Sequence, residues 1–533
     1  MLLFLPVFLT LIFTILIQVV GRSRIPLGTK WLILTAIAVL LWGTTMAMQM
    51  KLSLTQTIGH WLPSGQSAET LAFTLDRASW TLSMALLSML VGIILTDTGR
   101  LGTSQNLSEW TQLLMLTFLG LVAVLANSPL AFLLTWTLID LVEIVVLVGI
   151  HPKDELPVQT IAVFGSRFAG TVFVLLAMVL GYQNGSSLAL SQASGTPLTL
   201  LVFGAALRLG VVPLHLPYTM DINLRRSLGS ALRLIPPLAA FAFITRLPVV
   251  TNISGWLVFV LLFAVLGTLF GSIKWFSSKN ELEGRPYWLM AFSSLALISL
   301  LNGKPEAAGY LGLIMAVLGS WTFLQSIELK WLKFLTPLAV LAMIGFPFTS
   351  SATLVGAFNQ GGASATFFLV WIGLAFLSAG LVKFSVVQNS EQKSVETWQR
   401  LFYIAGMVFL LLVPWLVEIW YFSEWTNLSG LVSGLATAIL LGIILALTYS
   451  AKVRAAIIPK LNQRFFDLTK KIGLILERFF HFDWFYLFIG FFVNLVERML
   501  NSINAILEGE GGILWALVFL VLLISLLSSV RGG

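Results

Sequence analysis

The chain contains no cysteine and only four histidines among 533 residues, and these absences exclude several kinds of chemistry. Without thiols it can form neither disulfides nor the cysteine ligation of iron–sulfur clusters. The histidines stand far apart, with no pair at helical spacing, so we expect neither a haem nor a zinc site. The glycine-rich loops that hold nucleotide phosphates are also missing. We therefore expect no cofactor and no metal.

Charge is equally scarce. Charged residues make up 10% of the chain and hydrophobic residues 58%, with a mean hydropathy of +0.95. A soluble domain carries about 25% charged residues, so this composition cannot cover a surface that faces water. The net charge of +8 is spread over short loops rather than gathered in a patch, so we expect no nucleic-acid partner. The composition excludes a soluble enzyme and indicates an all-α polytopic membrane protein.

Long apolar runs recur along the whole chain. A bilayer span needs about 20 such residues, and the runs predict about sixteen transmembrane helices. They fall at 2–20, 31–48, 78–96, 111–126, 129–150, 158–182, 198–216, 227–247, 253–273, 287–301, 306–327, 334–358, 365–388, 402–421, 427–450 and 512–529. The first run lacks a basic flank and a cleavage site, so we expect it to remain as a helix.

Lysines and arginines lie mostly in the connections that follow odd-numbered runs. Positively charged short loops stay on the cytoplasmic side of a membrane, so the connections after odd-numbered spans are expected there and the N-terminus outside. We expect a multi-pass protein of the cell inner membrane. The segment 452–503 alternates apolar and basic residues at helical period, which is typical of an amphipathic helix. That helix would lie on lipid headgroups or along other subunits, and whether 484–503 crosses the membrane stays open.

Two of the predicted spans contain helix-breaking residues. The seventh holds Pro213 and Pro217, and the twelfth holds Gly345 and Pro347 before a run of hydroxyl side chains. Proline frees a backbone carbonyl, which in lipid must find a partner in protein or water. Ordinary kinks would explain either break alone, but breaks at matching places are typical of inverted-repeat transporters. We expect six parts: 1–110 (helices one to three), 111–250 and 251–390 (two inverted five-helix repeats), 391–450 (helices fourteen and fifteen), 451–511 (the interfacial segment) and 512–533 (the last helix).

Charges inside spans cost about 2.5–3.5 kcal/mol each on insertion scales and are therefore candidates for function. The clearest are Asp140, Glu143, Arg167 and Arg208. Asp140 and Glu143 share a helix face, so either a basic partner neutralises them or one of them takes up a proton. Both a structural ion pair and a proton relay fit this pattern. Glu418, at the end of span fourteen, is expected at the membrane interface.

The stretch from Arg208 to Pro217, RLGVVPLHLP, resembles the helix-seven signature of the antiporter-like subunits of respiratory complex I. The same family includes subunits of Mrp antiporters, of membrane-bound hydrogenases and of a two-part inorganic-carbon uptake system. The sequence GFPFT, from Gly345 to Thr349, is similar to the family's motif at the second break. The resemblance implies partner membrane subunits, a row of buried charges across the membrane, and translocation of H⁺ or Na⁺.

Several positions depart from the family pattern. Arg208 stands where the family has a lysine, Asp140 or Glu143 replaces the glutamate of helix five, and His215 matches the family histidine. The middle of helix eight is Pro236-Pro237-Leu238, and the family's helix-twelve charge falls near Val355, so two positions of the row are neutral.

The resemblance implies a non-redox membrane-arm subunit of a complex I-like (NADH dehydrogenase or hydrogenase type) or Mrp-like complex. Its proton or cation pathway would run through Asp140, Glu143, Arg167, Arg208 and His215, intact or degenerate. Two alternatives remain. The chain could be a scaffold that does not pump, or the membrane subunit of a two-component inorganic-carbon uptake system. Whether the complex is an oxidoreductase or an antiporter stays open.

Overall fold

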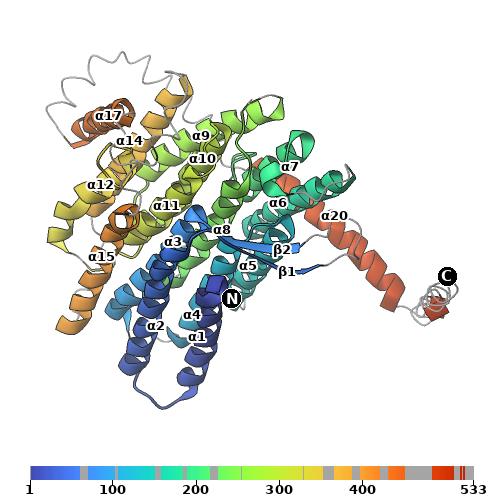
Figure 1. The fold of residues 1–533 in the computed structure, drawn as a ribbon, viewed down its shortest axis with the longest axis horizontal. Coiled ribbons are helices and arrows are strands. Elements are labelled where there is room, and N and C mark those ends of the chain that lie inside the picture. Colours follow the sequence, from blue (N-terminus) through green and yellow to red (C-terminus); the bar gives the residue numbers. More distant parts are fainter. Residues whose placement is uncertain are drawn as a thin grey trace.

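The computed structural model describes most of the chain as a bundle of helices that run side by side (Figure 1). The described residues are 2–60, 70–101, 106–150, 158–183, 189–215, 226–251, 253, 255–327, 329–351, 354, 365–386, 396–419, 430–449, 483–508, 517–518 and 520–521.

The α-helices follow the apolar runs of the sequence. They are α1 (Leu5–Arg22), α2 (Leu27–Ala47), α3 (Arg77–Thr96), α4 (Asn106–Leu125), α5 (Pro129–Ile150), α6 (Val158–Gln183), α7 (Gly195–Arg208), α8 (Arg226–Arg246), α9 (Trp256–Ser277), α10 (Glu281–Leu301), α11 (Ala307–Phe323), α12 (Thr336–Ile344), α14 (Ala365–Val386), α15 (Thr397–Glu418), α17 (Leu431–Tyr449) and α20 (Asp483–Glu508). Short 3₁₀ turns are η1 (Leu2–Phe4), η2 (Met48–Lys51), η3 (Asp97–Arg100), η4 (Leu190–Gln192) and η5 (Lys330–Leu335).

Eleven of the described helical segments are long and apolar enough to cross a membrane. Three shorter apolar helices accompany them, at Gly195–Arg208, Ala307–Phe323 and Trp331–Ile344. The predicted all-α polytopic class is confirmed at this level, whereas the count of about sixteen spans, the two inverted repeats and the six-part division stay predictions.

Helix α8 lies at the centre of the bundle. Its apolar window is 94% buried, against 22% for α17 at the periphery. It packs against α4, α11, α3 and α10, which surround it in the bundle. Any polar side chain on α8 must therefore find its partners inside the protein, because neither lipid nor water reaches it.

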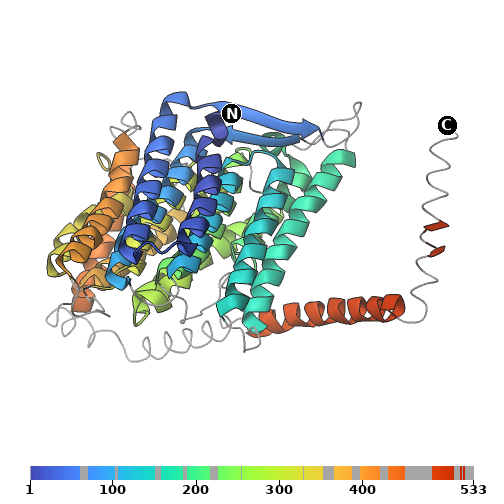
Figure 2. The same ribbon diagram turned by 90° about the horizontal axis from the view of Figure 1, so that it is seen from below.

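A β-hairpin, which the sequence did not lead us to expect, crosses one end of the bundle. Strands β1 (Leu54–His60) and β2 (Thr70–Leu75) pair antiparallel between α2 and α3. Arg246, the last residue of α8, ties the hairpin down by donating to the carbonyl of Thr74 at 3.2 Å and pairing with Asp76. The hairpin therefore marks the end of the bundle at which α8 finishes (Figure 2).

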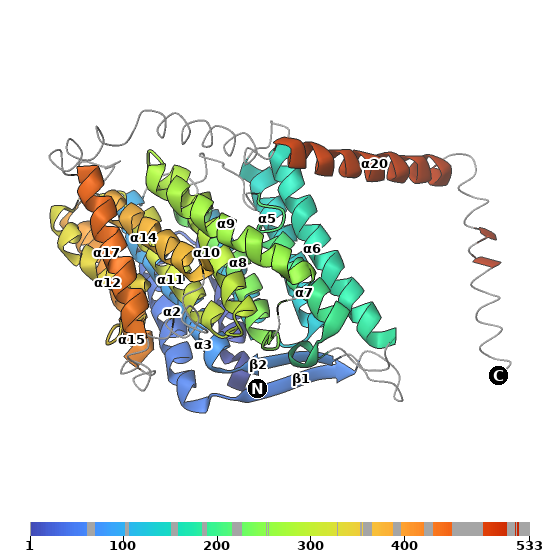
Figure 3. The same ribbon diagram turned by 90° about the horizontal axis from the view of Figure 1, so that it is seen from above.

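Helix α20 runs across the opposite end of the bundle, at a steep angle to the spans (Figure 2, Figure 3). It contacts α6 and then continues past the bundle. Its described apolar side chains are largely exposed, among them Leu487, Phe488, Phe491 and Met499. The predicted amphipathic segment thus contains a helix at 483–508, while 451–482 and nearly all of the predicted last helix lie outside the described residues.

Candidate functional site

Four charges from three helices, three of them buried and one half-buried, meet where α5, α6 and α7 pack together. Asp140 and Glu143 lie on α5, Arg167 on α6, and Arg208 is the last residue of α7. The two terminal nitrogens of Arg208 donate to the two carboxylate oxygens of Asp140, each at 2.9 Å. Arg167 donates to Glu143 at 2.7 Å and also pairs with Asp140. We call these four residues the quartet; in it, Asp140 is shared by both arginines.

The quartet is largely buried and, with both acids ionised, carries no net charge. Relative exposures are 0% for Arg167, 1% for Arg208 and 4% for Glu143, and the Asp140 side chain is 16% exposed. Two guanidinium groups face two carboxylates, so basic partners neutralise the acids that share one face of α5 without a proton being needed. Hydrogen bonds between charged groups are stronger than those between neutral groups. Removing one partner of a buried pair costs about 3–5 kcal/mol, because the remaining charge is left without compensation.

Two glycines bring α7 close enough to α6 for Arg208 to reach the quartet. A Cβ atom on Gly204 would lie 2.8 Å from the carbonyl oxygen of Gly170, and one on Gly170 would lie 2.6 Å from that of Gly204. The two backbones therefore touch, as small residues allow in membrane helices. The guanidinium of Arg208 also lies over the ring of Trp136, 4.5 Å from its centroid, and donates to the Trp136 carbonyl at 3.3 Å.

His215 lies beside α6, after the end of α7. Its ring is fully buried, with Nδ1 2.7 Å from the carbonyl oxygen of Pro213 and Nε2 2.9 Å from the hydroxyl of Ser166. A carbonyl only accepts, so Nδ1 carries a hydrogen. The Ser166 hydroxyl lies 2.8 Å from the Val163 carbonyl, so it can donate there when Nε2 is protonated and to Nε2 when it is not. His215 can thus hold one or two protons with its hydrogen bonds intact.

The five predicted pathway residues lie in one region of the structure. His215 contacts Ser166 of α6, and the next residue of α6, Arg167, belongs to the quartet. Of the predicted helix breaks, Pro213 lies two residues before His215, and Pro217 lies outside the described residues. The second break lies at α12, which ends at Ile344 with Gly345 at φ 73°.

Side chains satisfy the backbone at the second break. The Ser351 hydroxyl accepts from the Gly345 amide at 2.9 Å and donates to the Leu341 carbonyl at 2.8 Å. A small hollow beside it is lined by Met343, Ile344, Gly345, Leu354, Trp371, Leu374, Ser433 and Thr437.

Glu418, which we expect at the membrane interface, is the last residue of α15 and is buried by neighbouring helices. Its side chain is 1% exposed and lies inside the protein, within electrostatic reach of Tyr310. Tyr310 donates to the carbonyl of Ala342, near the C-terminal end of α12. The sequence places Glu418 at the end of an apolar run, which favours the membrane interface. The burial of its side chain follows from the packing of α15 against α11 and α12, which cover the C-terminal end of α15.

Sequence reasoning also missed a set of arginines that it assigned to loops. Arg226 and Arg233 lie on α8 and Arg285 on α10, each no more than 5% exposed. Arg226 donates to Glu281 at 2.7 Å. Arg233 lies within electrostatic reach of both Glu143 and Arg285. Arg233 lies inside the apolar run 227–247, which is a signal that could have identified it, whereas Arg226 and Arg285 stand just before the runs 227–247 and 287–301.

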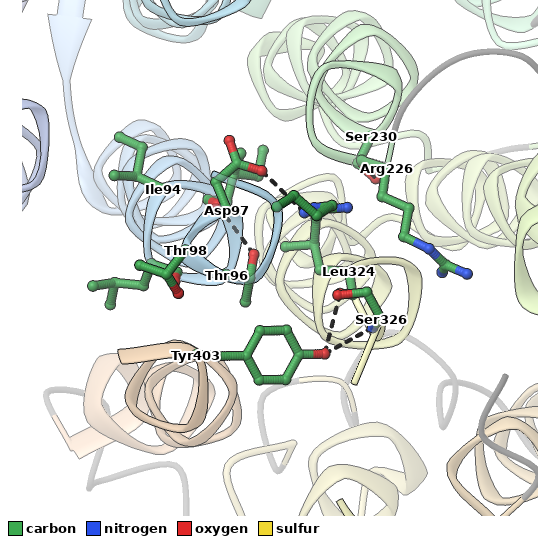
Figure 4. A network of polar contacts seen from close by, with 12 residues as sticks. Ile94, Thr96, Asp97, Thr98, Arg226, Ser230, Leu324, Ser326 and Tyr403 are labelled. Atoms are coloured by element: carbon green, nitrogen blue, oxygen red, sulfur yellow. Dashed lines mark hydrogen bonds and ion pairs between the residues drawn. The ribbon is translucent and has the colours of Figure 1, made fainter. Parts of the chain in front are cut away.

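The neighbouring ends of α3 and α11 carry further polar contacts, and Figure 4 draws those of Tyr403. Asp97 accepts from Arg100 at 3.0 Å and from the Trp110 ring nitrogen at 3.4 Å. The Tyr403 hydroxyl, from α15, accepts from the Ser326 amide at 2.8 Å and donates to the Leu324 carbonyl at 3.3 Å. These bonds fix α15 to the C-terminal end of α11.

No known family profile matches the sequence, and no curated protein matches it. Two solved structures share the fold at low identity. One chain of the membrane-bound sulfane sulfur reductase, an archaeal respiratory membrane complex, aligns over 98% of this chain and 100% of its own length, with a TM-score of 0.64 and 14% identity. One chain of the Mrp complex from Dietzia sp. DQ12-45-1b aligns over 100% of this chain and 63% of its own length, with a TM-score of 0.66 and 13% identity. The chain therefore has the fold of membrane subunits found in multi-subunit complexes.

Proposed function

We propose that the chain is an antiporter-like membrane-arm subunit of a complex I-like or Mrp-like assembly, and that the quartet takes part in translocation of protons or cations. The observation that carries this proposal is the sharing of Asp140 between Arg208 of α7 and Arg167 of α6. Buried ionisable groups in membrane helices are costly and usually mark an ion pathway. The shared fold with subunits of a respiratory complex and of an Mrp complex supports the same assignment.

The arginines restrict which groups can carry a proton. A guanidinium keeps its charge because it is a very weak acid, whereas a lysine at this position could release a proton when buried. Protons would therefore be held by Asp140, Glu143 or His215, and the arginines would respond by changing partners. A proton on Asp140 would weaken both of its ion pairs at once and leave Arg208 without a full counter-charge. Such a change of pairing would pass between α5, α6 and α7.

The exposed apolar side chains of α20 fit a role in assembly. A helix that lies across the end of the bundle and continues past it can cover the membrane surface of a neighbouring subunit or the lipid headgroups. With the N-terminus outside, as the charge distribution predicts, α20 would lie on the cytoplasmic side. We propose this orientation for an inner membrane.

A scaffold that does not pump is the second candidate, and one observation favours it. The two arginines of the quartet balance its two carboxylates, so the ion pairs are complete without a bound proton. The centre of α8 carries Pro236 and Pro237 rather than a charged residue. Buried ion pairs can also serve to fix helix packing.

Two experiments test the proposal. Isolation of the intact complex from the native membrane and its mass determination should show additional membrane subunits, and a chain that purifies alone would contradict membership. Reconstitution of the complex with Arg208→Ala should then reduce coupled proton transfer at least tenfold. Transfer at the wild-type rate in that variant would assign the chain to the scaffold role.

A further inference from the structure

We propose that the hollow beside the second helix break binds one water molecule, and that this water links α12, α14 and α17. Among the described residues, the hollow is lined by the end of α12, by Trp371 of α14 and by Ser433 and Thr437 of α17. The three helices pack against one another. The site is separate from the quartet and does not depend on the proposed translocation.

Trp371 supplies a hydrogen-bond donor to the site. Its ring nitrogen Nε1 is shielded from solvent and makes no hydrogen bond with the residues that the structure describes. A buried N–H group without an acceptor lowers stability, because burial takes away its bond to water. Buried polar groups in proteins therefore nearly always have a partner in the protein or in ordered water. Since Trp371 lines the hollow, a molecule bound there is placed to be that acceptor.

The two hydroxyl groups of α17 supply acceptors. Ser433 and Thr437 are buried, with exposed fractions of 5% and 0%. Each hydroxyl already donates to a carbonyl of its own helix segment, Ser433 to Gly430 at 3.0 Å and Thr437 to Ser433 at 2.8 Å. A hydroxyl has one hydrogen and two lone pairs. With the hydrogen used, each oxygen keeps lone pairs that accept from a ligand.

The end of α12 supplies further acceptors. The last four carbonyl groups of a helix have no amide partner inside it. In α12 the carbonyls of Leu341 and Ala342 accept from hydroxyl groups of other residues. Met343 and Ile344, the last two residues of the helix, line the hollow. Their carbonyl groups are thus close to a molecule bound there and are candidates to accept from it.

This mixture of one donor and several acceptors selects the ligand. A cation is repelled by the N–H group of Trp371, and an anion is repelled by the lone pairs of the hydroxyl and carbonyl oxygens. Water both accepts and donates, so it satisfies the two kinds of group together.

The size of the hollow agrees with a single water. Its empty volume is about 230 Å³, part of it open at the surface, and only a small part admits a water-sized sphere. A bound water needs room for about one such sphere and about two to four polar partners. A lipid acyl chain is the competing occupant, because α17 lies at the periphery of the bundle. An acyl chain accepts no hydrogen bond and leaves Trp371 Nε1 unsatisfied.

The direct test is a cryo-EM map of the protein isolated from the native membrane, at a resolution that shows ordered water. We expect a compact peak about 2.7–3.2 Å from Trp371 Nε1 and within hydrogen-bond distance of an oxygen of α12 or α17. Elongated density of an acyl chain in the hollow would overturn the proposal. So would a hydrogen bond from Trp371 Nε1 to another residue, or no peak here in a map that shows other buried waters.

A double-mutant cycle tests the bridge in the membrane. Trp371→Phe keeps an aromatic ring without the donor, and Thr437→Val keeps the shape without the hydroxyl. If one water joins the two residues, the double variant should lower Tm in nanodiscs by clearly less than the sum of the two single shifts. Additive shifts would overturn the bridge.

Thr117→Val is the matched control. Thr117 is also fully buried and donates to a carbonyl four residues earlier at 2.8 Å, but it lies on α4, which packs against α1, α5 and α8. Combined with Trp371→Phe, this variant should give an additive shift in Tm. Equal departures from additivity in both pairs would count against a local bridge and overturn the proposal.

Discussion

Arg208 and Asp140 form a two-point ion pair, with both carboxylate oxygens of Asp140 at 2.9 Å from the terminal nitrogens of Arg208. The pair joins the end of α7 to the middle of α5 across 68 positions of the sequence. Arg167 holds the same carboxylate from a third helix. A single carboxylate therefore links three helices, and its protonation state bears on all of them.

Removal of one member of this pair should be more harmful than removal of both. Arg208→Gln is expected to lower the free energy of unfolding by about 3 kcal/mol, the lower end for a buried pair, because the half-buried carboxylate of Asp140 loses one of its two cations. The double variant Arg208→Gln with Asp140→Asn should recover a clear part of that loss, as measured by thermal unfolding in nanodiscs. Additive losses in the double variant would show that the two residues do not interact.

Arg208→Lys separates charge from geometry. Lysine keeps the positive charge but loses the two-point contact, and when buried it can release a proton. If the arginines act by changing partners, this variant should still translocate protons, at a reduced rate and with a changed pH profile. Reconstituted vesicles with a pH-sensitive dye report both quantities. An unchanged rate and profile would mean that the proton does not pass the pair.

The contact between α6 and α7 should be sensitive to one added methyl group. Gly204→Ala places a Cβ atom 2.8 Å from the backbone oxygen of Gly170, which cannot move as a side chain does, and should destabilise the protein by about 1–3 kcal/mol. Gly43→Ala on α2 is the control, because nothing lies within 4 Å of its Cβ position, and should be neutral or stabilising. Equal effects of the two variants would exclude close packing as the reason for Gly204.

Tyr403 should contribute to stability through its hydroxyl. Tyr403→Phe keeps the ring but leaves the Ser326 amide and the Leu324 carbonyl without this partner, at a cost of about 1–3 kcal/mol. Calorimetric or fluorescence unfolding of the purified protein measures the loss. Tyr182→Phe serves as a comparison, since Tyr182 is exposed, and a similar loss there would show that the effect is not specific to the junction of α11 and α15.

The sequence predicts the helices well and their partners poorly. Apolar runs specify where spans form, since backbone groups in lipid must form their hydrogen bonds within a helix. Asp140 and Glu143 lie inside such a run, and this position alone predicts that their negative charge needs a cation or a proton beside it. Which cation serves which acid depends on the approach of α6 to α7, and that is set by the packing of Gly170 on Gly204. Glycine in a membrane helix is too common to reveal such a contact in advance.

The errors have physical causes as well. Arg233 and Arg285 lie near the ends of apolar runs and were assigned to loops, but neighbouring helices cover those ends and bury both side chains. The β-hairpin escaped notice because its strands are short and polar residues alternate with apolar ones only over a few positions. A hairpin of this kind depends on the bundle end beneath it, including the hold of Arg246 on Thr74.

Proton uptake by vesicles that carry the reconstituted complex with Asp140→Asn is the most direct test of translocation through the quartet. Asparagine keeps the shape of the side chain and removes its charge, so neither arginine retains its shared partner. Glu306→Gln, at an exposed position before α11, is the control and should pump like wild type. We predict at least a tenfold fall in coupled proton transfer for Asp140→Asn with the complex intact. Wild-type transfer by an intact Asp140→Asn complex would contradict a pathway through these residues.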